Sequence, residues 1–583
     1  MKSLVAQVLT DAIASLPSLA ELATDIASAN TVERTRDVTH GDFASNIALR
    51  LAKPARQKPR DIAQSIIAAL PANDLIDKVE IAGPGFINFY LSPAAFHAEL
   101  ETILDRGEHY GRQAAKDGPK ILLEFISANP TGPLHVGHGR HAAYGATVGN
   151  LLEAAGYPVS REYYVNDAGR QMDILGASVW LRLLESKGVT LSFPKAGYRG
   201  DYIRDIASSI DTSTVGDVSA ADLSAGLPDD EPEGDKEAYI EALIARAKQL
   251  LGDDGFDHIR QQALDSILAD IKDDLAEFGV VFDRWYSEQS LSKTGRIDDA
   301  LEVLRKRDML YVKDGATWFP ATRFGDEKDR VVVRENGVKT YFASDIAYHF
   351  DKRERGFDHL LDILGADHHG YVARVRAGLE AMGYAADDLE VELVQFVSLY
   401  RGGEKMQMST RSGEFDTLRQ LRAEVGNDAA RFFYVSRSND QHLDFDLDVA
   451  KSQSNDNPVF YIQYAHARIA SVFRQLGEKS LKWDEANGRR HLAKLEEAQE
   501  KALLTSLSRY PELIELAASN RAPQHLVHYL RDLANDFHSW YNAQVFIVDD
   551  AHLRDARLAL CAATRTVLAN GLAILGVSAP ESM

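Results

Sequence analysis

Cysteine is nearly absent from this sequence, since Cys561 is the only one among 583 residues. An intrachain disulfide and a zinc site built from several cysteines are therefore excluded, and such cysteine usage is typical of a reducing cytoplasm. The sequence also lacks any uninterrupted run of about 18 apolar residues, the length that a membrane-spanning helix needs. The apolar stretch near the amino terminus is broken by Asp11 and shows no small-residue cleavage site, so no secretory leader is expected. We predict a cytoplasmic protein that does not bind membranes.

Positive charge is scarce as well. The chain has 65 lysines and arginines against 87 aspartates and glutamates, a net charge of −22, which argues against a surface that binds polyanions generally. The acidic excess lies mainly in residues 114–450, whereas 451–583 is neutral, so the two ends of the chain repel an anionic macromolecule less than the centre does. One basic cluster lies near the amino terminus and comprises Arg50, Lys53, Arg56, Lys58 and Arg60. A solvated helix face is the alternative interpretation of this basic cluster.

The spacing of apolar residues divides the chain into three parts. Residues 1–113 mix helical and strand patterns and predict an N-terminal α/β domain. In residues 114–450, short apolar runs alternate with helical segments, which predicts a parallel-sheet domain with an acidic, helical insertion at about 185–300. Residues 451–583 show only helical spacing and predict an all-helical bundle. The strands predicted for the parallel sheet are 121–125, 159–165, 331–333 and 360–364.

The most informative stretch is residues 127–140, which read SANPTGPLHVGHGR. It follows the predicted strand 121–125, and its prolines suit a turn after which a helix begins near Val136. The start of a helix exposes unpaired N–H groups that bind phosphate well. His135 and His138 would place two donors beside that position, and Gly137 leaves room for a flat base or a phosphate.

Three other interpretations of this stretch remain open. The spacing Gly137-x-Gly139-x-x-Ala142, with Glu162 as a ribose ligand, weakly fits a dinucleotide-binding fingerprint. The two histidines could be metal ligands, although no third ligand lies nearby in the sequence. A Pro/Gly turn with incidental histidines is the third alternative.

Residues 135–138 resemble the HIGH signature of class I aminoacyl-tRNA synthetases, and the context 129–134 is similar to bacterial arginyl-tRNA synthetases. Residues 407–413, QMSTRSG, lie 272 positions downstream and resemble the partner KMSKS signature. The segments 41–46 and 83–86 are similar to the family's N-terminal domain, and 428–431 and 457–468 to its helical anticodon-binding module. The resemblance implies a Rossmann-like catalytic domain (114–450) between an N-terminal tRNA-contacting domain (1–113) and an anticodon-binding domain (451–583).

An arginine pocket needs several oxygen acceptors, because the five N–H donors of a guanidinium cannot be buried unpaired. Glu124, Tyr341 and Asp345 match the family's side-chain ligands for arginine. Without the resemblance, Glu124 would be an exposed acid at a strand end, and Asp345 a helix N-cap. The resemblance also assigns the α-groups of arginine to a set of four residues, namely Ser127, Asn129, His135 and His368.

The resemblance implies a two-step reaction in which ATP activates L-arginine and the arginyl group passes to tRNA-Arg. Catalytic roles fall to His135, His138, Ser409 and Arg411, and Mg²⁺ would accompany ATP. The expected ATP-binding residues are Val136, Gly137, Gly139, Met408, Ser409 and Thr410. The expected tRNA-binding residues are Arg50, Lys53, Tyr461, Tyr464 and Arg468, although helical aromatic residues more often pack in a core. The family resemblance further implies a monomer.

The sequence departs from the family pattern at the second signature. Gln407 and Thr410 stand where KMSKS has lysines, and the turn before His135 also lacks a lysine that some relatives carry. Lys405 and Arg411 are the candidates to replace this charge, and we expect Arg411 to contribute most. Two rival functions follow: a synthetase for another amino acid, and a catalytically inactive tRNA-binding relative.

Overall fold

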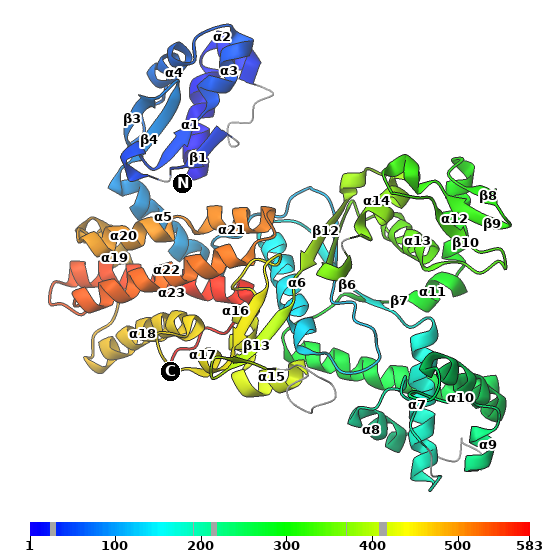
Figure 1. Ribbon diagram of the computed structural model, residues 1–583. Coiled ribbons are helices and arrows are strands. Elements are labelled where there is room, and N and C mark those ends of the chain that lie inside the picture. The colour runs from blue at the N-terminus through cyan, green and yellow to red at the C-terminus, as the bar shows by residue number, and fades with distance from the viewer. Residues whose placement is uncertain (24–30, 36, 190–191, 212–217, 369, 407–416) are drawn as a thin grey trace.

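The computed structural model describes residues 1–583 apart from 24–30, 36, 190–191, 212–217, 369 and 407–416. The amino-terminal part forms a small domain that stands apart from the rest of the molecule in Figure 1. Its antiparallel sheet has the order β1-β2-β4-β3, with strands β1 (Val32–Arg34), β2 (Phe43–Ser45), β3 (Ile76–Ala82) and β4 (Phe86–Leu91). Its helices are α1 (Lys2–Ala14), α2 (Pro17–Ala23), α3 (Ile47–Ala55) and α4 (Pro59–Ala68).

The centre of the molecule is a five-stranded parallel sheet. Its strands are β5 (Ile121–Phe125), β6 (Val159–Val165), β7 (Arg284–Ser287), β11 (His359–Gly365) and β12 (Leu389–Val394). The order β12-β11-β5-β6-β7 means that the chain builds outward from β5 in one direction and then returns to the other side of β5 with β11. The parallel sheet predicted from the sequence is confirmed, and the change of direction between β5 and β11 is where such sheets bind ligands.

One predicted strand lies elsewhere. Residues 331–333 belong to β10 (Arg330–Val333), which pairs with β9 (Ala316–Phe319) and, through it, with β8 (Tyr311–Lys313) in a separate antiparallel sheet. The prediction that 331–333 joins the parallel sheet is wrong. Parallel neighbours need a crossover of a dozen residues or more, whereas β8 and β9 are joined by the short turn at Asp314 and Gly315.

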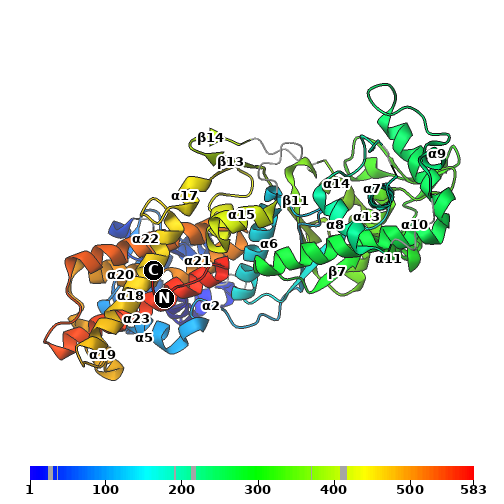
Figure 2. The same ribbon diagram turned by 90° about the horizontal axis from the view of Figure 1, so that it is seen from below.

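Helices surround the parallel sheet and form the insertion (Figures 1 and 2). They are α6 (Val136–Ala154), α7 (Arg170–Ser186), α8 (Asp201–Ser209), α9 (Ala220–Ser224), α10 (Lys236–Glu277, broken at Gly252), α11 (Glu288–Lys293), α12 (Arg296–Lys306), α13 (Tyr341–Glu354) and α14 (Val372–Ala381). A further sheet of order β14-β13-β15 follows, with β13 (Val397–Arg401), β14 (Glu404–Lys405) and β15 (Leu443–Asp446). Beside it lie α15 (Leu418–Val425), α16 (Asn427–Tyr434) and α17 (Leu447–Lys451).

The carboxyl-terminal part is a helical bundle, as the spacing of its apolar residues predicts. Its helices are α18 (Pro458–Glu478), α19 (Glu485–Arg490), α20 (Ala498–Leu507), α21 (Tyr510–Ser519), α22 (Pro523–Ala543) and α23 (Ala551–Leu575). Helix α23 is long and apolar enough to cross a membrane, but 72% of its most apolar window is buried inside the protein, so it is the core helix of the bundle. Helix α5 (Pro93–Arg106) packs on α23 and α20 and connects the amino-terminal domain to the bundle.

A buried arginine links α16 to the end of α23. Arg431 is 2% exposed, and its guanidinium donates to the carbonyl oxygens of Leu575 (2.9 Å) and Phe278 (3.1 Å). Gly576 ends α23 in the left-handed conformation (φ 69°), and a Cβ at this position would run into the Arg431 guanidinium. Gly576 therefore allows both the left-handed backbone that ends α23 and the close approach of the Arg431 guanidinium.

We expect Gly576→Ala to lower the apparent midpoint of thermal unfolding more than Gly356→Ala. Gly356 also has a positive φ (85°) after a helix, but a Cβ there would meet open space. The control should lose only the conformational cost of about 1–2 kcal/mol. Gly576→Ala should lose in addition about 1–3 kcal/mol, because displacement of Arg431 leaves buried polar groups unpaired. Equal midpoints for the two variants would contradict the role of Arg431.

Candidate active site

A cavity of about 640 Å³ lies where the carboxyl ends of β5 and β11 meet the start of α6. This is the change of direction of the parallel sheet, where ligands of such folds bind. Its lining includes Glu124, Ser127, Asn129, His135, Gly137, His138, Tyr341 and Asp345. The structure thus brings together most of the described residues that the sequence analysis connects with arginine and ATP.

A strained turn forms the cavity wall after β5. Ile126 (φ 68°) and Ser127 (φ 41°) both adopt positive φ, which is costly for residues other than glycine and marks a conformation held by its surroundings. The Ser127 hydroxyl donates to Glu124 Oε1 (2.9 Å) and accepts from the backbone N–H of Tyr164 (3.1 Å). The Tyr163 hydroxyl donates to the carbonyl of Ala128 (3.0 Å). These bonds fix the turn against β6.

His135 and His138 stack on each other at the first turn of α6, with ring centroids 3.5 Å apart. Each ring nitrogen Nδ1 lies 3.3 Å from the backbone nitrogen of the other histidine, so the pair caps the helix start that the sequence predicted near Val136. Burial, with smaller contributions from His135 and His141, holds the pKa of His138 well below its usual value. His138 is therefore a neutral hydrogen-bonding group near pH 7.

Val136, within the HIGH-like residues 135–138, and Gly139, just after them, do not line the cavity. Val136 is 1% exposed in the hydrophobic core, and its carbonyl accepts from the Tyr434 hydroxyl (2.8 Å). A Cβ on Gly139 would lie 2.7 Å from both Leu418 Cδ1 and the Tyr434 oxygen, so this glycine permits close packing of α6 on α15 and α16. The ATP-binding roles expected for Val136 and Gly139 would therefore fall to their backbone and stay predictions, whereas Gly137 lines the cavity.

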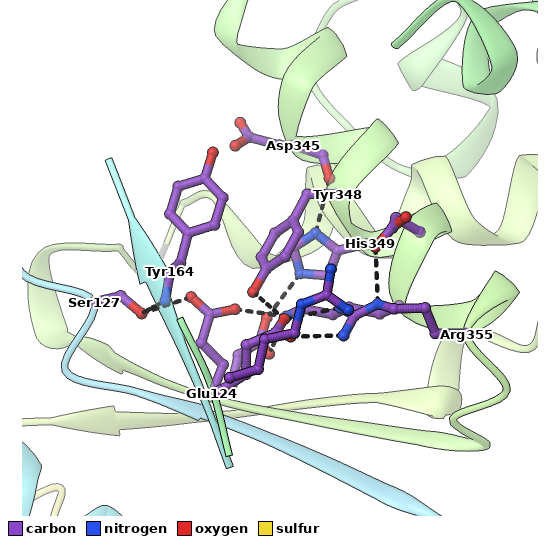
Figure 3. A network of polar contacts seen from close by, with 12 residues as sticks. Glu124, Ser127, Tyr164, Asp345, Tyr348, His349 and Arg355 are labelled. Carbon is purple, nitrogen blue, oxygen red and sulfur yellow. Dashed lines mark hydrogen bonds and ion pairs between the residues drawn. The ribbon is translucent and has the colours of Figure 1, made fainter. Parts of the chain in front are cut away.

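The two acids expected to hold arginine both line the cavity, but in different settings (Figure 3). Glu124 is 6% exposed and already accepts from Lys352 Nζ (2.6 Å), which excludes the alternative of an exposed strand-end acid. Asp345 lies inside α13, whose N-cap is Thr340, which excludes the N-cap alternative. The Tyr371 side chain hydrogen-bonds to Asp345, and burial, with Asp345, raises the pKa of Tyr371 well above its usual value.

A third acid, Glu288, lies close to Asp345. Glu288 is 7% exposed, and its Oε2 has no hydrogen-bond partner in the part of the chain that the structure describes. Burial, together with the carboxylates of Asp345 and Asp167, raises the pKa of Glu288 to about 7, and a hydrogen bond with Tyr164 opposes the shift. A buried carboxylate without a cation is suited to receive a positively charged ligand.

Glu162 excludes the dinucleotide interpretation. This acid is 0% exposed and bonds to Arg355 (2.6 and 2.9 Å) and to the Tyr348 hydroxyl (2.7 Å), so it is not available to a ribose. Gln407, Met408, Ser409, Thr410 and Arg411 lie outside the described residues, as does the side chain of His368. Thr417, just after this segment, forms a β-bridge with His135, so the chain returns to the cavity at that point.

The residues expected to bind tRNA lie in two places. Arg50 and Lys53 are exposed on α3, Arg56 and Lys58 are exposed between α3 and α4, and Arg60 is exposed in the first turn of α4. In the bundle, the Arg468 guanidinium stacks over the Tyr464 ring (4.3 Å), and Tyr461 lies beside the ring of His538 (centroids 4.5 Å apart). These bundle side chains are half-buried rather than core.

Several cavity residues escaped the sequence analysis. Tyr164, Tyr371 and His141 line the cavity, and Lys352 and Glu288 lie beside it. His141 follows His138 at helical spacing, a signal that was available. Lys352 and Glu288 carry no local signal, because their partners Glu124 and Asp345 are 228 and 57 positions away.

Comparison with known proteins covers nearly the whole chain. Residues 1–91 match the arginyl tRNA synthetase N terminal domain, 99–443 the catalytic domain of class I (R) tRNA synthetases, and 462–583 the DALR anticodon binding domain. Arginine–tRNA ligases from Thioalkalivibrio sulfidiphilus and Legionella pneumophila (strain Paris) are 59% and 54% identical to the chain, each over 100% of both proteins.

Solved structures agree with this assignment. A Campylobacter jejuni structure described as an arginyl tRNA synthetase is 32% identical, covers 85% of this chain and 100% of its own, and has a TM-score of 0.72. Thermus thermophilus arginyl-tRNA synthetase, at 23% identity, covers 99% of this chain and 100% of its own with a TM-score of 0.73, and so supports the fold. The chain belongs to the arginyl-tRNA synthetase family of class I aminoacyl-tRNA synthetases.

Proposed function

We propose that this chain is an aminoacyl-tRNA ligase that activates L-arginine with ATP and transfers it to tRNA-Arg. The observation that carries the proposal is the pairing of two acids, the half-buried Asp345 and the buried Glu288, beside a cavity whose other end is the histidine-capped start of α6. The acids suit a guanidinium, and the helix start suits a triphosphate.

The guanidinium of arginine binds between Asp345 and Glu288, with the Tyr341 hydroxyl as a further acceptor. Tyr341 is 70% exposed at the start of α13 and lines the cavity. Glu124, predicted from the sequence as a second guanidinium ligand, is already neutralised by Lys352. We therefore assign Glu124, with Ser127 and Asn129, to the ammonium end of arginine. His135 and His368 remain the residues proposed for the carboxylate side.

ATP binds with its phosphates at the first turn of α6. His135 and His138 donate to phosphate oxygens, and Gly137 leaves space for them. Within the described ranges, no three His, Cys, Asp or Glu side chains form a cluster that could hold a metal. We therefore propose that Mg²⁺ arrives with the triphosphate, whose oxygens are its usual ligands together with water.

The reaction needs no protein nucleophile. The arginine carboxylate attacks the α-phosphorus in line, the bond to pyrophosphate breaks, and arginyl-adenylate forms. A ribose hydroxyl of the terminal tRNA adenosine then attacks the acyl carbon, and AMP leaves. The protein contributes by aligning the two reactants and by donating hydrogen bonds to the charge that develops on the phosphate. Ser409 and Arg411, with Met408 and Thr410, are proposed to complete this site. The proposal also includes cytoplasmic location and a monomeric enzyme.

The first experiment is ATP–pyrophosphate exchange with each amino acid, with and without tRNA-Arg. We expect exchange with arginine alone among the twenty amino acids, because a neutral side chain would leave Asp345 and the buried Glu288 without a cationic partner. Asp345→Asn should reduce kcat/KM for arginine by about 10³-fold or more, because the guanidinium loses a charge-assisted partner.

Asp351→Asn is the matched control for Asp345→Asn. Asp351 lies on the same helix, is 5% exposed and pairs with Arg355 (2.8 Å), but does not line the cavity. It should affect stability and leave the KM for arginine within a few-fold of the wild type. Exchange with another amino acid, or none with any amino acid, would contradict the proposed function.

The KM for arginine should depend on pH through Glu288. With a pKa of about 7, this carboxyl is protonated below pH 7 in the free enzyme, and arginine binding must then release a proton. The affinity therefore rises as the pH rises through 7, and KM increases by up to about tenfold per unit below it. Glu288→Gln should raise KM and remove the pH dependence, whereas the KM for ATP stays level. A pH dependence that survives in Glu288→Gln would contradict this assignment.

The basic cluster on α3 should contribute to tRNA affinity. Arg50→Glu/Lys53→Glu/Arg56→Glu should weaken tRNA binding by about tenfold or more and reduce the slope of log K against log salt by about 2–3. The control is Lys306→Glu/Lys313→Glu/Lys328→Glu, which changes the net charge equally at exposed lysines elsewhere. Filter binding across a salt series measures both quantities, and equal slopes for the two variants would remove the cluster from the interface.

A further inference from the structure

Three buried acids stand in a row across the middle of the parallel sheet. Glu162 on β6, Glu124 on β5 and Asp362 on β11 are register partners on neighbouring strands. Their exposed fractions are 0%, 6% and 3%. Like charges directly opposite one another repel, and a buried charge is costly unless it is paired. The sheet can keep this row only if another element brings cations to it.

Helix α13 brings those cations. Lys352 is 0% exposed, and its Nζ lies between Glu124 Oε2 (2.6 Å) and Asp362 Oδ1 (2.8 Å). His349 Nε2 contacts Asp362 Oδ2 (2.7 Å), and Arg355 pairs with Glu162 (2.6 Å). Figure 3 shows Tyr348, His349 and Arg355 converging from this helix on the acids of the strands. Lys352 is the member that joins two strands.

Lys352 and Asp362 are held as ions. Burial lowers the pKa of Lys352, but the carboxylates of Asp362 and Glu124 outweigh burial and raise it above its usual value. Burial likewise raises the pKa of Asp362, but Lys352 and His349 outweigh it and hold that pKa low. Lys352, Glu124 and Asp362 therefore form a buried ion-pair cluster that joins α13 to the sheet.

This ion-pair cluster lies between the end of the cavity proposed for the ammonium group of arginine and the end proposed for its guanidinium. On one side, Glu124 holds the Ser127 hydroxyl in the strained turn that faces the ammonium end. On the other side, Asp345 lies seven residues before Lys352 on the same helix, so the two side chains share a face two turns apart. The position of Lys352 between Glu124 and Asp362 thus sets the position of α13 along its axis. That position sets the distance between Asp345 and the strained turn at Ile126 and Ser127.

We propose that Lys352 is a positioning residue that fixes the length of side chain accepted by the arginine site, acting through Glu124 and through the axial position of α13. The inference rests on the proposed function of the cavity. Lys352 itself contacts neither arginine nor ATP in this proposal, because its three N–H donors face Glu124, Asp362 and the ring of Tyr348, 4.3 Å from Nζ.

The experiment compares arginine with L-homoarginine, which is one methylene longer, in aminoacylation of tRNA-Arg. Lys352→Met keeps the length of the side chain and removes its charge. We expect the KM for arginine to rise by about 10- to 100-fold while the KM for ATP changes little. We also expect the preference for arginine over homoarginine to fall by about tenfold or more.

The matched control is Arg557→Met. Arg557 pairs with Glu500 (2.8 Å), and the two side chains are 6% and 0% exposed inside the helical bundle, so the variant likewise strands a buried acid. It should lower the thermal midpoint as Lys352→Met does, with the KM for arginine unchanged. If both variants change arginine selectivity equally, the effect is one of general stability and the inference fails.

A charge-balanced variant keeps the test decisive if Lys352→Met does not accumulate as folded protein. Lys352→Met/Asp362→Asn removes one charge of each sign and should recover stability. It still leaves Glu124 without its ion pair to Lys352, so the raised KM for arginine and the lost preference for arginine over homoarginine should persist. Wild-type selectivity in this double variant would overturn the positioning role. A wild-type enzyme that charges no arginine at all would instead refute the proposed function.

Discussion

The charge balance between one helix and one row of acids is the constraint on which the site depends. Glu162, Glu124 and Asp362 lie side by side in the sheet, and α13 supplies Lys352 and Arg355 to neutralise them. Removing one partner from a buried pair of this kind costs about 3–5 kcal/mol. These pairs stabilise the observed position of α13, in which Tyr341 and Asp345 near its amino-terminal end line the cavity.

Local patterns of the sequence predict the elements that form the cavity. The apolar run 121–125 is strand β5, and the Pro/Gly turn before Val136 leads into α6. Both follow from short-range physics: a mostly apolar run such as Ile121-Leu122-Leu123 predicts a buried strand, and a helix start needs a cap. The helical spacing after residue 451 is equally local, and the bundle confirms it.

The remaining features arise from contacts between distant parts of the chain. Lys352 looks like a surface residue within 351–354, a run of charged side chains, yet it is fully buried because Glu124 and Asp362 receive it. The antiparallel position of 331–333 depends on the short connections around it rather than on its three valines. Glu288 lies near Asp345 only because β7 and α11 bring it there. No local pattern encodes such neighbours.

Helix α6 joins the cavity to the anticodon-binding module. Its amino end carries the stacked histidines, whereas farther along Tyr144 donates to the carbonyl of Arg521 (2.8 Å) and Asn150 to that of Ile574 (2.9 Å), both in the bundle. Because α6 is a continuous helix hydrogen-bonded to the bundle through Tyr144 and Asn150, a tilt of the bundle would also tilt the amino end of α6. A movement of the bundle would thus reach the stacked histidines at the first turn of α6.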